Sequence, residues 1–200
     1  MKEVFQRVRS RACLAVALVA LALLSFAAPA GAEQFPPAPQ EDDVAFVQLG
    51  AVAELVTLRL YRAAAADQAL EPRERRTFGR LAKQQAKSFA GLNKLLGDDE
   101  LTDSDFGVRI PGEVLRSAAK TTALAARFER LLAGLYLSGV QSTIDPPTRL
   151  LIGKRLAAAS RDLTLIRALR GEKLNLKPLR RLSVEYVGIQ FDRYLTIPGA

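Results

Sequence analysis

Four long segments of this chain carry apolar residues at three- and four-residue steps, the spacing that gathers them on one face of an α-helix. These segments span residues 43–66, 72–96, 113–140 and 146–170. The links inside each pair are short, whereas the acidic, turn-rich stretch 98–112 separates the pairs and reaches on the order of 45–50 Å when extended. This order predicts an all-α chain: a four-helix bundle with one long crossover between the helix pairs, plus a short C-terminal extension.

Local signals mark the ends of these helices. Asp43 can cap the first helix, and Pro72 and Pro146 suit the first turns of the second and fourth. Gly97 and Gly171 suit the ends of the second and fourth, because glycine adopts the left-handed conformation that closes a helix. Further glycines fall inside the segments, where we expect them to let helices approach closely: Gly50, Gly134 and Gly139.

Residues 1–32 have the layout of a secretory signal peptide. Basic residues precede an uncharged run over residues 13–32, and Ala30 and Ala32 fit an A-x-A cleavage site. An uncleaved membrane anchor is the alternative, because the uncharged run approaches spanning length. A proline-rich linker over residues 33–42 would follow. We therefore expect an exported protein, either secreted or held in the cell envelope.

The residue inventory excludes most acid–base and metal chemistry. The chain has no histidine, and its one cysteine, Cys13, and its one methionine, Met1, lie within the segment that cleavage would remove. Imidazole is the commonest general base and metal ligand. Serine–histidine and cysteine–histidine catalysis and thiolate metal sites therefore cannot be assembled in the mature chain.

Two of the segments echo one another. The stretch ELVTLRLY runs from Glu54 to Tyr61 and ERLLAGLY from Glu129 to Tyr136, so that the acids lie 75 residues apart and so do the tyrosines. The helical spacing puts each glutamate in the middle of an apolar face. A carboxylate there is costly unless it is paired, protonated or bound to a cation. We therefore expect a buried polar seam with these members: Glu54, Tyr61, Gln85, Glu129 and Tyr136.

With these spacings the chain resembles the ferritin-like superfamily, and more closely the exported ferritin-like domains of bacteria, over residues 43–171. The stretch LAKQQAKSFAGLNKLLG is similar to a family pattern A-x-Q-E-x-x-H followed by an apolar run ending in LG. On that pattern Gln84 matches, while Gln85 stands in place of the glutamate and Ser88 in place of the histidine. The resemblance implies a di-iron site with a lone glutamate and a Glu-x-x-His from each helix pair.

Most of the implied ligand positions hold residues that bind metal weakly or not at all. With the same 75-residue offset, the position in the fourth helix that corresponds to Gln85 is Ser160, and the position that corresponds to Ser88 is Leu163. The six implied ligand positions are then Glu54, Gln85, Ser88, Glu129, Ser160 and Leu163. Only the two glutamates among them are strong ligands. We therefore expect a degenerate metal site with no metal, no cofactor, no catalytic residue and no enzymatic activity. Such a chain would be a non-catalytic binding or structural protein of the cell envelope.

The sequence leaves open what satisfies the two glutamates. One alternative is a metal-ion-binding protein that uses Glu54 and Glu129 with non-family ligands, such as Asp162 or water. The acids could also point to solvent at an edge of the bundle. Pointing inward, they could accept hydrogen bonds from a seam tyrosine, Gln85 or Ser88, share a proton, or meet an arginine from a neighbouring helix. They would then specify packing and register.

Basic residues gather late in the chain, which has a formal net charge of +8. Such a patch could contact an anionic membrane or cell-wall polymer weakly, and its members are Arg167, Arg170, Lys177, Arg180 and Arg181. No nucleic-acid-binding motif is present, so we expect no nucleic-acid partner. The extension over 172–200 fits either a short helix or a strand, and Tyr186, Phe191 and Tyr194 predict that it packs on the bundle.

Overall fold

The computed structural model describes residues 41–102, 105–173 and 178–196. The signal peptide expected over 1–32 and nearly all of the linker expected over 33–42 lie outside these residues. The described elements are, in chain order, α2 (Glu41–Ala66), α3 (Pro72–Asn93), the 3-10 helix η1 (Lys94–Asp99), β1 (Gly107–Val108), α4 (Gly112–Leu115), α5 (Ala118–Ser142), α6 (Pro146–Leu169), α7 (Val184–Asp192) and β2 (Leu195–Thr196). The predicted all-α class is confirmed.

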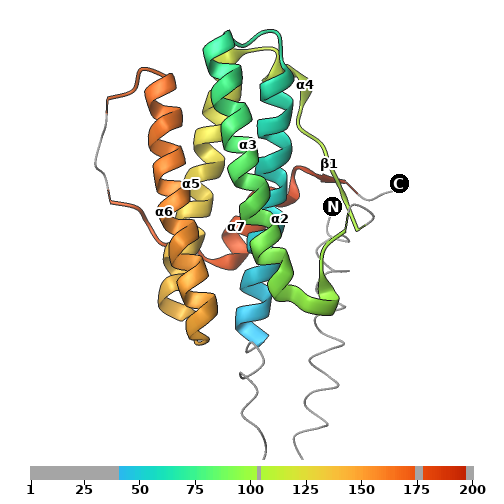
Figure 1. Cartoon of the computed structure of the whole chain (residues 1–200), viewed down its shortest axis with the longest axis vertical. Coiled ribbons are helices and arrows are strands. Elements are labelled where there is room, and N and C mark those ends of the chain that lie inside the picture. Colours follow the sequence, from blue (N-terminus) through green and yellow to red (C-terminus); the bar gives the residue numbers. More distant parts are fainter. Residues whose placement is uncertain (1–40, 103–104, 174–177, 197–200) are drawn as a thin grey trace, which may run out of the picture.

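The four long helices, α2, α3, α5 and α6, lie side by side along the long axis of the molecule (Figure 1). α2 packs on α3, α5 packs on α6, and α2 meets α5 between the two pairs, whereas α3 and α6 touch only slightly. The chain leaves the lower end of α3 and re-enters at the upper end of α5, so this connection runs the length of the helices (Figure 1). α2 is therefore antiparallel to both α3 and α5.

Several helix ends follow the signals in the sequence. Pro72 is the first residue of α3, and the Asp145 side chain caps α6 by accepting the backbone N–H of Thr148 at 2.9 Å. Gly97 and Gly171 adopt the left-handed φ angles of 58° and 66° that glycine tolerates. Gly171 follows α6 as predicted. α3 ends at Asn93, earlier than predicted, and Gly97 bends the chain inside the 3-10 helix η1 that follows.

The prediction of one continuous helix over residues 113–140 is wrong at the N-terminal end of this segment. The chain forms the single turn α4, breaks, and begins α5 at Ala118. Ser117 lies in an extended conformation at the break, and its hydroxyl caps α5 by accepting the backbone N–H of Lys120 at 3.4 Å. A serine that satisfies a free N–H in this way favours a new helix start over continuation of the old one.

The C-terminal extension forms both structures that the sequence left open. α7 packs on α2 and α5, with Val187 and Phe191 fully buried. The ring of Phe128 in α5 lies 4.9 Å, between centroids, from the rings of Phe191 and Tyr194. β2 pairs antiparallel with β1 of the crossover. Tyr186 remains 49% exposed, so Phe191 and Tyr194 supply the aromatic packing of the extension.

Interior glycines permit close approach, as predicted. A Cβ added at Gly139 would lie 2.2 Å from the ring of Phe46, and one at Gly134 would lie 2.6 Å from the side chain of Leu182. At Gly50 the nearest atom, from a leucine of α3, would be 3.3 Å away. Only a residue without a side chain therefore fits at Gly139 and Gly134 with these neighbours in place.

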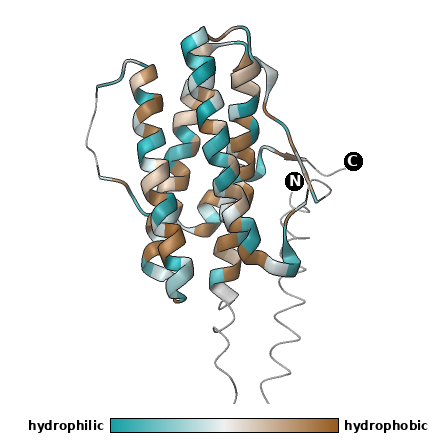
Figure 2. Cartoon of the chain, in the orientation of Figure 1, coloured by the Kyte–Doolittle hydropathy of each residue, from teal (hydrophilic) through white to brown (hydrophobic). Residues whose placement is uncertain are grey.

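Residues Asp43–Ala66 of α2 are long and apolar enough, by length and composition, to cross a membrane. Within this segment, 67% of the most apolar window is buried inside the molecule, as in the core helix of a folded domain. Hydrophobic and hydrophilic turns alternate along the long helices, so each presents both kinds of surface (Figure 2). The apolarity of α2 is thus accounted for by the core that it forms with α3 and α5.

Candidate functional site

The echoed glutamates and tyrosines bond to each other across the two central helices. The Tyr136 hydroxyl of α5 donates to Oε1 of Glu54 in α2, and the Tyr61 hydroxyl of α2 donates to Oε1 of Glu129 in α5. All four side chains are buried, with exposures of 3% or less. Because α2 and α5 are antiparallel, the pairing is reciprocal. The alternative in which the acids point to solvent is wrong.

α3 brings two more polar side chains to this seam. Gln85 is buried and donates its amide N–H to Oε2 of Glu54, so both oxygens of Glu54 accept a hydrogen bond. Ser88, one turn further along α3, accepts a hydrogen bond of 2.5 Å from Arg155 of α6. The positive charge of Arg155 also opposes the rise that burial causes in the pKa of Glu54. Glu54 therefore has a tyrosine, an amide and a nearby arginine as neighbours.

α6 contributes to the seam through residues that the 75-residue offset did not indicate. Ser160 is only partly buried, and its hydroxyl donates to the Leu156 carbonyl of its own helix at 2.8 Å. Leu163 is buried as an apolar core residue. The acid that α6 buries is Asp162, which accepts a hydrogen bond of 3.1 Å from Arg161. The α6 residue whose charge acts on both glutamates is thus Asp162, and Ser160 bonds within its own helix.

The buried face of α6 is rotated from the predicted one. Ala159 is buried where Ser160 was expected, together with Ile152, Leu163 and Ile166. At 100° per residue, Ser160 lies at the edge of that face. The 75-residue offset would hold only if both helix pairs had the same link, but residues 67–71 join α2 to α3 and residues 143–145 join α5 to α6. The shorter link changes the register of α6 relative to its partner.

Burial raises the pKa of both glutamates. Desolvation raises the pKa of Glu54 from 4.5 to about 7, against the lowering effects of the Tyr136 hydrogen bond and the Arg155 charge. Desolvation raises the pKa of Glu129 well above 4.5, and the negative charge of Asp162 adds to the rise. Burial therefore favours the protonated form of Glu129, and Glu54 titrates close to neutral pH.

One oxygen of the network has no donor. Oε2 of Glu129 is buried and has no hydrogen-bond partner among the described residues. Protonation lowers the free-energy cost of burying this oxygen without a hydrogen bond, because a neutral carboxyl group loses far less hydration energy on burial than a carboxylate does. Burial also raises the pKa of Tyr61 and Tyr136 well above 10, so both phenols stay protonated and act as donors.

These residues do not fit a di-metal centre. The chain has no histidine, and among the residues that the structure describes no group of three or more His, Cys, Asp and Glu side chains is placed to hold a metal ion. Both oxygens of Glu54 already accept hydrogen bonds, and a cation would have to displace those donors. The arrangement can hold protons and fix the register of the helices.

The late basic patch is already partly engaged. Arg167 and Arg170 form ion pairs with Glu172, and Arg181 donates to Gln141 at 2.7 Å. Lys177 lies outside the described residues, and Arg180 is exposed. The charges of this patch are therefore less available to a partner than the sequence suggests.

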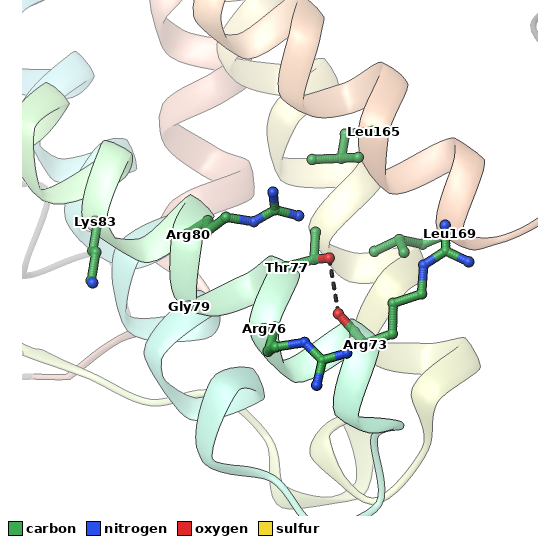
Figure 3. Close-up of a pocket in the computed structure, with 8 residues that line it drawn as sticks. All are labelled: Arg73, Arg76, Thr77, Gly79, Arg80, Lys83, Leu165 and Leu169. Atoms are coloured by element: carbon green, nitrogen blue, oxygen red, sulfur yellow. Dashed lines mark hydrogen bonds between the residues drawn. The ribbon is translucent and has the colours of Figure 1, made fainter.

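The structure reveals a basic groove that the sequence analysis missed. It lies between α3 and α6, has a volume of about 590 Å³, and is lined by Arg73, Arg76, Thr77, Gly79, Arg80, Lys83, Leu165 and Leu169 (Figure 3). The signal was present in the sequence, because the four basic residues follow one another at steps of three, four and three. At 100° per residue they fall within an arc of about 80°.

In comparisons with known proteins, no family model, no curated protein and no solved structure matches this chain.

Proposed function

We propose that this chain is a ferritin-like four-helix bundle that has lost its di-iron centre and acts as a non-catalytic binding or structural protein. The reciprocal bonds between the glutamates and tyrosines of α2 and α5 carry this proposal. They give both carboxyl groups that the family would use as ligands another role, as hydrogen-bond acceptors that hold the helices in register. Export to the cell envelope or beyond rests on the layout of residues 1–32.

The order of the helices supports the ferritin-like part of the proposal. α2 and α3 form one antiparallel pair, α5 and α6 form another, and the connection through η1, β1 and α4 returns the chain along the length of the molecule (Figure 1). Di-iron bundles of this family have the same sequence of pair, crossover and pair. The negative charge of Glu54 also raises the pKa of Glu129, so the two acids are close enough to interact.

A second candidate is a metal-ion-binding protein with non-family ligands, and one observation favours it. Oε2 of Glu129 is buried without a donor, and the charge of Asp162 reaches the same carboxyl group. A cation held between Glu129 and Asp162 would satisfy both. Tyr61 and Arg161 already donate to these two acids, which leaves few free lone pairs for such an ion.

Metal analysis of the purified protein separates the two candidates. We expect far less than one equivalent of iron, manganese or zinc per chain, and no rise in Tm when these ions are added, because Tyr61, Tyr136 and Gln85 already donate to the two carboxyl groups. The matched control is Glu129→Gln, which removes the carboxyl group that either candidate needs. Near-stoichiometric metal that disappears in Glu129→Gln would contradict the proposal and establish the second candidate.

A further inference from the structure

The basic groove between α3 and α6 concentrates positive charge without any acid to balance it. Arg73, Arg76, Arg80 and Lys83 line it, and no aspartate or glutamate is among the lining residues. Arg73, Arg76, Arg80 and Lys83 are all exposed, and none of them forms an ion pair with a carboxylate of the described residues. Four like charges on one helix face repel one another, so a bound anion would stabilise this arrangement.

Three arginines of α6, by contrast, have hydrogen-bond partners. Arg149 donates to the Thr143 carbonyl, Arg155 to Ser88, and Arg161 to Asp162. Each of these side chains is thus used inside the fold. The guanidinium groups of the α3 face are left for solvent or for a ligand, and Figure 3 shows that of Arg80 extending from α3 toward α6.

The opposite wall of the groove is apolar. Leu165 and Leu169 of α6 line it, and Leu165 is 36% exposed. The Thr77 hydroxyl on the α3 side is buried and already donates to the Arg73 carbonyl at 3.0 Å. The groove therefore presents cations on one side and hydrocarbon on the other, with a volume within the range of small-ligand sites.

We propose that this groove binds the headgroup of an anionic phospholipid. Arg76 and Arg80 contact the phosphate, because the planar guanidinium forms paired hydrogen bonds with phosphate oxygens. Arg73 and Lys83 add charge at the two ends of the groove. Leu165 and Leu169 contact the first methylenes of the acyl chains, which a free phosphate or an ordinary polyanion lacks. The proposal concerns residues outside the carboxylate–tyrosine seam and holds whether or not the fold is ferritin-like.

Calorimetric titration of the full chain with short-chain dihexanoyl phosphatidylglycerol, below its micelle concentration, tests the proposal. We expect saturable binding that weakens about tenfold or more in Arg76→Gln/Arg80→Gln, since each basic contact with an anionic lipid contributes on the order of one factor of five. The matched control is Arg180→Gln/Arg181→Gln, which removes the same charge outside the groove and should change affinity less than about twofold. Equal weakening in the two variants would overturn the proposal.

Further ligands test whether the groove recognises a phospholipid or only a phosphate group. Dihexanoyl phosphatidylcholine should bind far more weakly than the glycerol lipid, and glycerol 3-phosphate and inorganic phosphate should bind more weakly still. Leu165→Gln/Leu169→Gln should weaken lipid binding and leave the weak phosphate binding unchanged. Phosphate binding as tight as lipid binding would overturn the lipid assignment.

The variant Arg76→Lys/Arg80→Lys keeps the charge at two exposed positions and should retain part of the affinity for the lipid. Complete loss of binding in this variant, with an unchanged Tm, would contradict phosphate binding by charge.

Discussion

At the scale of single residues, the seam is asymmetric although its sequence repeats. Among the described residues, Glu54 accepts from Tyr136 and from Gln85, whereas Glu129 accepts from Tyr61 alone. The second oxygen of Glu129 has no donor among the described residues, and burial raises the pKa of this carboxyl group well above its usual value. The repeated sequence therefore produces two acids with different hydrogen-bond partners, because the second helix of each pair contributes different side chains.

This asymmetry predicts unequal costs for removing the two phenol hydroxyls. Tyr61→Phe leaves Glu129 with no donor and should lower the free energy of unfolding by about 1–3 kcal/mol. Tyr136→Phe leaves Glu54 bonded to Gln85 and should cost less. Urea denaturation measures both changes. Tyr186→Phe, at an exposed position, is the control and should be neutral. Equal costs for Tyr61→Phe and Tyr136→Phe would mean that Gln85 does not support Glu54.

The raised pKa of Glu54 predicts that stability falls between pH 5 and pH 7. An unfolded glutamate loses its proton near 4.5, whereas Glu54 holds its proton up to about 7, so the folded state binds more protons and rising pH favours unfolding. Each proton retained contributes a slope of about 1.4 kcal/mol per pH unit. Burial also raises the pKa of Glu129, so this group contributes to the fall in stability in the same direction.

Few other groups interfere with this measurement. The chain has no histidine, and Asp145, whose pKa is lowered by hydrogen bonds from Thr148, titrates below the window. Asp162 has a pKa raised by burial, against Arg161, and contributes in the same direction as the glutamates. Urea midpoints at several pH values give the slope, and Glu54→Gln should flatten it. A stability that rises from pH 5 to pH 7 would contradict the buried, protonated seam.

At the scale of elements, the sequence predicted what depends on local and periodic signals. The positions of the glutamates and tyrosines on the inner faces of α2 and α5 follow from helical spacing, and the helix start at Pro72 and the stop before Gly171 follow from residue chemistry. The hydrogen-bond donors to Glu54 and Glu129 could not be assigned from the sequence, because they depend on how α2 and α5 cross. The position of Ser160 at the edge of the buried face could not be assigned either, because it depends on the rotation that the α5–α6 link gives to α6.

Two glycine substitutions test how closely the elements pack. Gly139→Ala should destabilise the protein by about 1–3 kcal/mol, because its Cβ would lie 2.2 Å from the ring of Phe46 in α2. Gly79→Ala, in a helix with only the Ala65 Cβ at 4.0 Å, should stabilise it by up to about 1 kcal/mol through helix propensity. Thermal and urea unfolding measure both. A neutral Gly139→Ala would show that α2 and α5 can separate at this point without cost.

At the scale of the whole molecule, the C-terminal extension joins parts of the chain that lie far apart in sequence. α7 packs on α2 and α5, and β2 pairs with β1 in the crossover, Gly107 opposite Thr196 and Val108 opposite Leu195. A strand pair of this length has almost no periodic signal, and its partner is remote in the chain. The sequence could therefore predict an extension that packs on the helices, but neither its mixed helix and strand nor its contact with the crossover.

This arrangement predicts that the extension unfolds together with the long helices. Phe191 is fully buried, and its ring centroid lies 4.9 Å from that of Phe128 in α5, so Phe191→Ala should cost about 3–5 kcal/mol. Ile189→Ala, on the exposed face of α7, is the matched control and should change little. Denaturation followed by both circular dichroism and tyrosine fluorescence should give one coincident transition in the wild-type chain and in Phe191→Ala, with the midpoint of the variant lowered. If Phe191→Ala left the main transition unchanged and released only the extension, α7 would be an appendage, and the core would end with α6.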